Sequence, residues 1–140
     1  MAGDTRVTGG GAFGHTKKIH RIGTLSIAGF CGHAFMGLLV IDWLRTKRNP
    51  GVLQKVIPAD ERDSVDVMEL TPGGIILWNG WGIPLRLEEK HWAIGSGHRA
   101  ALTAMNDGAT AREAVLAALV NDEASGPPVQ VEYLKPKRKR

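Results

Sequence analysis

Hydrophobic and polar residues alternate with a period of two along two neighbouring stretches near the start of the chain. Residues 18–22 alternate, and residues 24–30 alternate again after Gly23. Successive side chains of a strand point to opposite faces, so this pattern predicts two antiparallel strands joined by a tight turn. Before them, residues 1–8 are interpreted as the end of a strand running into a turn, followed by a flexible turn at residues 9–11.

A helical spacing follows Gly32. Apolar residues recur three and four positions apart over residues 35–43, which predicts a helix that ends near residue 45 or 46, before an Asn-Pro-Gly sequence. Residues 52–57 suggest only a short helical stub before Pro58.

The middle of the chain is predicted to be a meander of strands. Residues 65–70 alternate, residues 74–78 form a continuous apolar run after a Thr-Pro-Gly turn, and residues 84–87 follow an Asn-Gly turn. A further short strand is expected over residues 91–94, and a last strand over residues 129–134.

Two helices are predicted in the last third of the chain. The first begins at His98 and ends at residues 106–108, Asn-Asp-Gly, because glycine readily adopts the left-handed conformation that ends many helices. The second begins after Thr110, since Thr110 and Glu113 have the spacing of a capping box.

The order of these elements is strands, helix, strands, two helices and strand, without an internal repeat. Segregated runs of this kind indicate an α+β layered fold rather than alternating βαβ units. Two antiparallel sheets with helices on both outer faces, a four-layer αββα sandwich, would use every element. One domain is expected over residues 1–134, followed by a basic, disordered tail over residues 135–140.

Composition is that of a folded domain. The chain has 140 residues, of which 43% are hydrophobic and 23% charged. Its single cysteine, Cys31, excludes an internal disulfide and fits a reducing compartment. The longest apolar stretch is interrupted by Asp42 and is shorter than the about 20 residues that span a bilayer. Since no signal peptide is visible either, we expect a cytoplasmic protein without a membrane partner.

The net charge of +4 comes from the end of the chain. Residues 135–140 carry five positive charges, and the rest of the chain is near neutral. Such a tail is usually a solvated end, and an arm that binds a polyanion is the alternative. Nucleic acid is therefore not expected as the main partner.

The sequence predicts no metal, cofactor or phosphate site. The histidines are scattered, one cysteine cannot form a thiolate cage, and the glycines at 9–11 lack the lysine of a phosphate-binding loop. Residues 95–98, Gly-Ser-Gly-His, do not have the pattern of a nucleophile elbow. Cys31 is interpreted as a small buried residue rather than a nucleophile.

Five short motifs, taken in their order along the chain, bear on its function. They are GDTRVT, TKKIHRI, LSIAGFCG before a helix, AIGSG before a second helix, and NDEASG before the last strand. Together they resemble a proteasome β-type subunit and the bacterial proteasome-like peptidase HslV. Each motif is weak by itself, whereas all five in this order, with the right elements between them, are specific.

The resemblance implies an N-terminal nucleophile hydrolase with four layers. In this family the nucleophile is the hydroxyl of a threonine that becomes the first residue of the mature chain, and its own α-amine acts as the base. The implied activity is threonine-type cleavage of polypeptides within an assembly of like subunits, with an ATP-dependent unfoldase as a candidate partner. No cofactor is implied.

The same resemblance assigns a first group of site residues. Asp4 matches the acidic residue at the end of the family's second strand, and Arg6 the basic residue two positions later. Lys18 matches the lysine beside the nucleophile, with Lys17 as the adjacent candidate. Its positive charge would favour the deprotonated oxygen and amine, and Asp4 would hold it in place.

A second group would complete the site. Gly29 matches the glycine whose backbone amide forms the oxyanion hole. Ser96 matches the serine near the threonine amine, and Asp122 and Ser125 match the aspartate and serine that complete that network. Each residue has a structural alternative, namely a strand-end glycine, a helix cap or the polar end of a helix.

The chain departs from the family at its start, where the first strand and its threonine are absent. Thr5 cannot replace this threonine, because cleavage before it would remove Asp4. Either a longer reading frame supplies the strand, which the retained site residues favour, or the chain is an inactive structural subunit. The chain as written is expected to lack peptidase activity. The short helical stub after Lys47 also replaces a long second helix.

Overall fold

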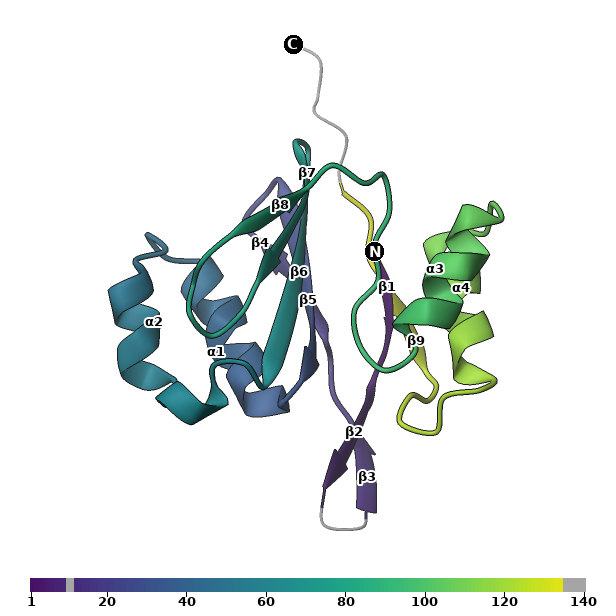
Figure 1. Cartoon of the computed structure of the whole chain (residues 1–140), viewed down its shortest axis with the longest axis horizontal. Coiled ribbons are helices and arrows are strands. Elements are labelled where there is room, and N and C mark those ends of the chain that lie inside the picture. The colour runs from purple at the N-terminus through teal and green to yellow at the C-terminus, as the bar shows by residue number, and fades with distance from the viewer. Residues whose placement is uncertain (10–11, 135–140) are drawn as a thin grey trace.

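The computed structural model describes residues 1–9 and 12–134, arranged in four layers (Figure 1). Two helices cover one face of a five-stranded sheet, a two-stranded sheet lies on its other side, and two more helices cover the two-stranded sheet. The predicted α+β sandwich with helices on both outer faces is therefore confirmed. The expected tail at residues 135–140 lies outside the described residues.

The five-stranded sheet is an antiparallel meander. Its strands, in spatial order, are β4 (Ile19–Ile22), β5 (Ser26–Gly32), β6 (Val65–Thr71), β7 (Gly74–Trp78) and β8 (Leu85–Leu87). Alternation along β6 puts every second residue against the first helical layer. The strands expected from the period of two are confirmed here, each within a few residues of its predicted bounds.

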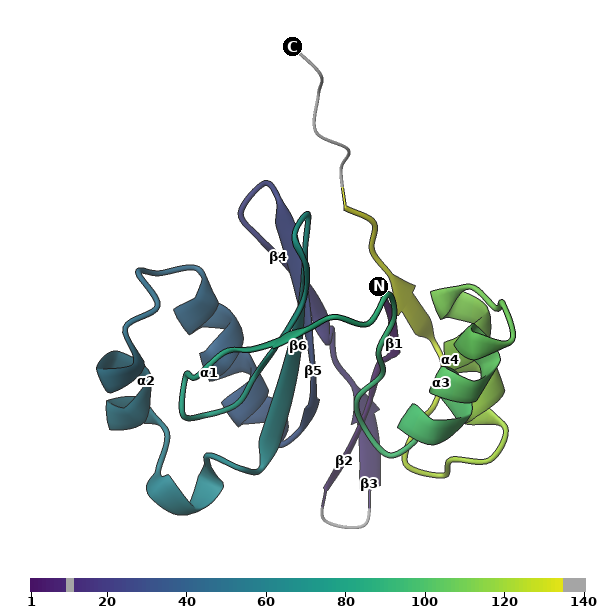
Figure 2. The same ribbon diagram turned by 45° about the horizontal axis from the view of Figure 1, so that its top comes forward.

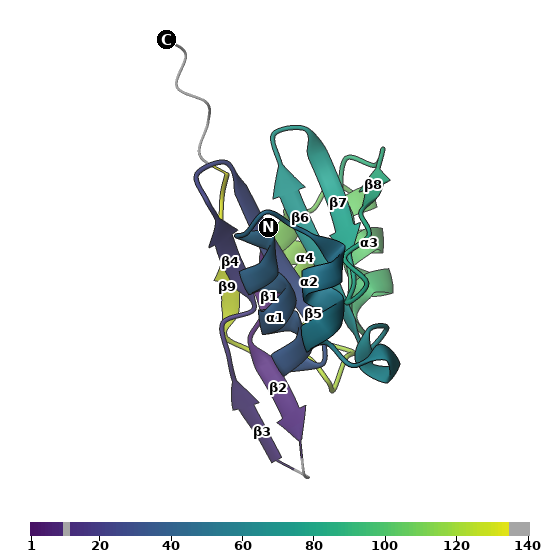
Figure 3. The same cartoon turned by 90° about the vertical axis from the view of Figure 1, so that its left-hand side faces the viewer.

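The second sheet joins the two ends of the domain. β1 (Ala2–Asp4) pairs antiparallel with β9 (Val129–Val131). Between β1 and β4, the strands β2 (Arg6–Gly9) and β3 (Ala12–His15) form a hairpin that projects from the body (Figures 2 and 3). The single strand end predicted over residues 1–8 is thus two short strands, and residues 10–11 of the expected turn lie outside the described part.

The first helical layer consists of α1 (Ala34–Leu44) and α2 (Pro50–Val56), followed by a 3₁₀ turn, η1 (Ala59–Glu61). The Asn49 side chain accepts a hydrogen bond from the Gly51 N–H and so caps α2, with proline in the first turn where it needs no donor. α2 has only seven residues, in agreement with the predicted stub. The main core lies between this layer and the sheet.

The second helical layer consists of α3 (His98–Asn106) and α4 (Ala111–Leu119). The predicted capping box is present: the Glu113 N–H donates to Thr110 Oγ1 at 3.3 Å, and the Thr110 N–H donates to Glu113 Oε2 at 2.8 Å. The buried side chains of this layer are alanines: Ala101, Ala114 and Ala118.

Two expected strands differ from the structure. Residues 91–94 are not a strand but part of an extended loop between β8 and α3. Within the described residues this short apolar run pairs with no strand, although β8 at the edge of its sheet has an unpaired side. The last strand ends at Val131 rather than at residue 134, although Glu132 still exchanges two backbone hydrogen bonds with Met1, at 2.9 and 2.8 Å.

Within the described residues, no helix is both long and apolar enough to cross a membrane.

Candidate active site

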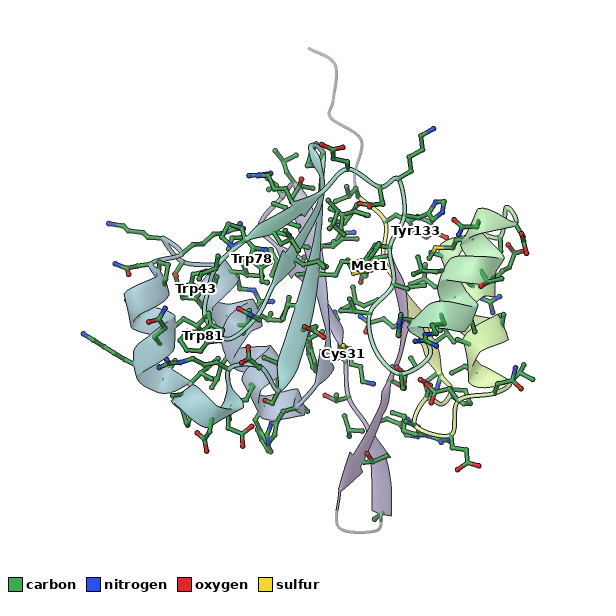
Figure 4. All side chains as sticks on the ribbon, in the orientation of Figure 1. Met1, Cys31, Trp43, Trp78, Trp81 and Tyr133 are labelled. Carbon is green, nitrogen blue, oxygen red and sulfur yellow. The ribbon has the colours of Figure 1, made fainter. Side chains whose placement is uncertain are left out.

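A cavity of about 1130 Å³ lies between the five-stranded sheet and the layers formed by β1, α3 and α4. The β2–β3 hairpin and the loop before α3 complete its walls. Figure 4 shows Met1 and Cys31 in this region between β5 and β1. The predicted site residues that line the cavity are Asp4, Arg6, Lys18, Gly29, Ser96 and Ser125.

Lys18 and Asp4 form an ion pair between the two sheets. Lys18 Nζ lies 3.0 Å from Asp4 Oδ1 and 3.2 Å from Oδ2, and only 15% and 16% of the two side chains are exposed. The backbone N–H groups of Arg6 and Gly126 donate to Asp4 Oδ2 at 3.0 and 3.3 Å. Of the two candidate lysines, Lys18 therefore reaches the cavity, whereas Lys17 is exposed.

Ser96, Asp122 and Ser125 form a second polar cluster. The hydroxyls of Ser96 and Ser125 donate to Asp122 Oδ2 at 2.5 and 2.6 Å, and the Ala124 N–H donates to Oδ1 at 3.1 Å. Partial burial opposes ionisation of Asp122, but these hydrogen bonds and the charge of Arg6 outweigh it, so the pKa of Asp122 is lowered. The carboxylate therefore stays ionised at neutral pH and keeps both hydroxyls oriented.

Arg6 connects the two clusters. Its Nη1 donates to the Glu123 carbonyl at 2.8 Å, in the loop that carries Asp122. Its guanidinium packs so closely on Gly126 that a Cβ there would overlap it. Because the Arg6 backbone N–H also bonds Asp4, the loop after α4 is attached to the end of β1.

Gly29 does not occupy the position expected of an oxyanion donor. It pairs with Met68 on β6. The Phe30 N–H donates to the Lys18 carbonyl on the β4 side, and successive N–H groups of a strand point to opposite sides, so the Gly29 N–H points towards β6. The missing side chain serves close packing instead, since a Cβ would lie 3.1 Å from Met1 Sδ. This geometry does not fit the oxyanion role assigned to Gly29.

Gly32 fits that role better and was not predicted. By the same alternation, the Gly32 N–H points to the side of β5 on which β4 lies. β4 does not extend as far as Gly32, and Gly32 lines the cavity. Its φ is +84°, and a Cβ would overlap the Ser64 carbonyl, so only glycine fits here. The available signal was a glycine placed directly between a strand and a helix.

Two other candidate nucleophiles are unsuitable. Burial and the nearby Asp66 charge raise the pKa of Cys31 to about 11, so the thiol is protonated at neutral pH and weakly reactive. Thr5 is buried outside the large cavity, where its hydroxyl donates to the Pro128 carbonyl at 3.1 Å and lies 3.3 Å from His15 Nδ1.

The cavity wall offers the Lys18 ammonium, two hydroxyls that the Asp122 carboxylate orients from behind, and a backbone donor. These groups can hold an amine, favour a deprotonated oxygen and stabilise a developing oxyanion. In the described part of the chain, no three His, Cys, Asp or Glu side chains are grouped so that they could hold a metal ion.

Protein-family models and curated protein sequences give no match to this chain. Solved structures do. BPH from Thiobacillus denitrificans in complex with epoxomicin has a TM-score of 0.70 at 23% identity, over 96% of this chain and 92% of that chain. Eukaryotic HslV from Trypanosoma brucei has a TM-score of 0.71 at 21% identity, over 94% of this chain and 90% of that chain. Another BPH structure from Thiobacillus denitrificans has a TM-score of 0.69 at 24% identity, over 96% and 92%.

The likeness covers both halves of the domain, since each match includes more than nine-tenths of this chain. At these identities it concerns the fold, and the fold agrees with the one that the five motifs imply. The chain has the N-terminal nucleophile hydrolase fold of the HslV and proteasome β-type peptidases.

Proposed function

We propose that the chain is a threonine peptidase subunit whose nucleophile is supplied by a threonine-led strand from outside these 140 residues. The observation that carries the proposal is the convergence of two polar clusters on one cavity. The Lys18–Asp4 pair stands on one part of its wall and Ser96, bonded to Asp122, on another. Ser125 shares the same carboxylate oxygen as Ser96.

Each group would have a distinct task. The Lys18 ammonium would favour the deprotonated threonine oxygen and the neutral amine, and Asp4 would hold that ammonium in place. Ser96 and Ser125, oriented by Asp122, would bind the amine that acts as the base. The Gly32 N–H would donate to the oxyanion of the tetrahedral intermediate. Arg6 would act indirectly, by holding the loop that carries Asp122.

The cavity and the edge of β1 support the added strand. Among residues 1–9 and 12–134, β1 pairs only with β9, and β1 rather than β9 lines the cavity. An extended segment paired with the open edge of β1 would complete its backbone hydrogen bonds. Apolar residues from the facing layers, including Leu70, Ile75 and Val115, would receive its side chains.

Polypeptide substrates, assembly with like subunits and a partner unfoldase belong to the same proposal. They rest on the fold shared with HslV and on the five motifs. α2 is short, so we expect subunit contacts to involve other surfaces to a greater extent than in the family.

The coding sequence upstream of Met1 is the first test. An in-frame strand led by threonine, about ten codons away, would support the proposal. A stop codon in that interval would instead favour an inactive structural subunit, which would assemble without cleaving peptides.

The biochemical test compares the chain with the same chain extended by the threonine-led strand. We expect the extended protein to cleave fluorogenic peptides and to lose this activity to epoxomicin, which binds BPH in the solved complex. The chain alone and an extended variant with alanine in place of the first threonine should be inactive. Covalent labelling of the unextended chain, or an extended protein that folds without activity, would overturn the proposal.

A further inference from the structure

We propose that Gln130 is a positioning residue that fixes Lys18 of one sheet relative to Asp4 of the other. Gln130 lies in β9 directly opposite Gly3 in β1. Opposite residues of antiparallel strands point to the same face, and Gly3 has no side chain, so the glutamine has room to reach β4. A Cβ on Gly3 would already lie 3.4 Å from Ile19 Cδ1.

The side-chain amide of Gln130 makes three hydrogen bonds with the backbone where β4 begins. Its Oε1 accepts from the N–H groups of Lys18 and Ile19 at 3.1 and 3.0 Å, and its Nε2 donates to the Ile19 carbonyl at 2.6 Å. The backbone here presents two N–H donors and one carbonyl acceptor. A primary amide can serve all three in a single orientation, because its oxygen accepts and its NH₂ group donates.

Gln130 takes the place of a neighbouring strand at this edge. Ile19 lies opposite Gly29, next to the hydrogen bond from the Phe30 N–H to the Lys18 carbonyl. By the alternation of an antiparallel ladder, the N–H and C=O groups of Ile19 point away from β5. β4 has a strand partner only on the β5 side among the described residues, so the glutamine amide satisfies polar groups that would otherwise lack a protein partner.

The tie acts beside the candidate active site. Asp4 follows Gly3 at the end of β1, and Lys18 is the residue directly before β4 begins. β1 and β4 belong to different sheets. The 3.0 Å contact between Lys18 Nζ and Asp4 Oδ1 therefore depends on the spacing of the sheets, which Gln130 holds at the adjacent residues. The consequence for catalysis rests on the proposed peptidase function, whereas the consequence for the ion pair does not.

The test replaces Gln130 by methionine, which has a similar length and no amide. The matched control is Gln54→Met, which removes the other glutamine of the chain and its hydrogen bond to the Trp81 carbonyl, 3.0 Å long, in the first helical layer. We expect the amide hydrogens of Lys18 and Ile19 to exchange about tenfold faster in Gln130→Met, the factor that corresponds to the loss of about one hydrogen bond. The control should leave them unchanged.

A chemical measurement separates positioning from simple stability. Acetylation of Lys18 is followed by mass spectrometry, with exposed Lys17 as the internal reference. We expect Lys18 to react up to about fivefold faster relative to Lys17 in Gln130→Met, as expected when a partly buried ion pair is loosened. Unchanged relative acetylation, with or without faster amide exchange, would overturn the positioning role.

One further variant and one kinetic measurement keep the proposal testable. Gln130→Glu retains an acceptor for both N–H groups, so it should fold even if the methionine variant does not, and its Lys18 acetylation should be intermediate. In the strand-extended protein, Gln130→Met should lower kcat with little change in KM. Inactivity of the extended parent would contradict the peptidase proposal alone, because exchange and acetylation are measured without activity.

Discussion

The two helical layers of this domain pack against their sheets in opposite ways. Under α1 and α2, the indoles of Trp43 and Trp78 meet edge to face with their centroids 5.4 Å apart (Figure 4). Leu44, Leu53 and Ile57 fill the space around them and are at most 2% exposed. Under α3 and α4 the buried side chains are alanines, and the space beside them is the large cavity.

This difference shows how one domain separates stability from chemistry. Large side chains on one interface interdigitate at crystal-like density and leave no room for a ligand. Alanines on the other interface allow close approach of helix and strand but cannot fill the layer beyond it. The polar residues of the candidate site stand on both sides of this cavity, since Lys18 precedes β4 of the five-stranded sheet whereas Asp4 and Ser96 belong to the facing layers.

Charge is also handled differently in the two halves. The half formed by α1, α2 and the five-stranded sheet, here called the packed half, buries the Glu69 carboxylate. This carboxylate accepts hydrogen bonds from Arg48 Nη1 and Nη2 at 3.0 and 2.8 Å and from the Trp78 indole N–H at 3.1 Å. All of these partners point at one carboxylate and so satisfy it. In the other half the charged groups line a space large enough to receive further atoms.

The largest expected effect comes from removing one indole from the packed half. Trp43→Ala should lower the free energy of unfolding by about 3–5 kcal/mol, because it leaves a cavity in a filled core. The same substitution at Trp92, which is half-buried on the wall of the existing cavity, should cost only about 1 kcal/mol. Urea unfolding measures both, and similar losses would contradict the contrast between the halves.

Enlarging a buried alanine should change the free energy of unfolding by an intermediate amount, with opposite signs in the two halves. Ala28→Leu should destabilise the fold by about 1–3 kcal/mol, because Ala28 is fully buried in the packed core. Ala101→Leu, on the cavity wall, should stabilise it by about 1 kcal/mol by filling open apolar space. Thermal unfolding reports the signs. In the strand-extended protein, Ala101→Leu should lower peptidase activity because leucine competes with the strand for space.

The smallest effect is a local response to acid at Asp122, whose hydrogen-bond partners Ser96 and Ser125 line the cavity. The pKa of Asp122 is lowered in the folded chain, so its hydrogen bonds contribute stability at pH values above the unfolded value of about 4. This contribution is lost as the pH falls through the lower folded value. The Ala124 amide signal, followed by NMR, should shift over that range, with the Ala28 amide as reference. Asp122→Asn should abolish the shift, and a shift that persists in this variant would assign it to another group.

Much of the fold could be predicted because its signals are local. The alternation before and after Gly23 and the capping box at Thr110 depend on neighbouring residues, and both elements form as expected. Residues 91–94 illustrate the limit, since a short apolar run becomes a strand only if the tertiary structure lays it beside a partner strand. β8 ends its sheet with an unpaired side, but residues 91–94 do not pair with it within the described residues.

The candidate site was predictable in part for the same reason. The motifs placed Asp4, Lys18, Ser96, Asp122 and Ser125, and the structure brings them together in two clusters. The choice between Lys17 and Lys18 needed the side-chain direction in space. The contrast between Gly29 and Gly32 needed the hydrogen-bond alternation of β5, because a sequence shows where glycines lie but not where their N–H groups point.

By itself, the sequence determined the order of strands and helices, the α+β layering and the residue types of the site, because these follow from periodicity, caps and short motifs. Only the tertiary structure decided that the alanine-rich layer encloses a cavity, that Gly32 presents its amide there, and that Gln130 joins the sheets beside Lys18 and Asp4. These features arise where segments distant in the sequence meet, and no local pattern encodes the spacing between two sheets.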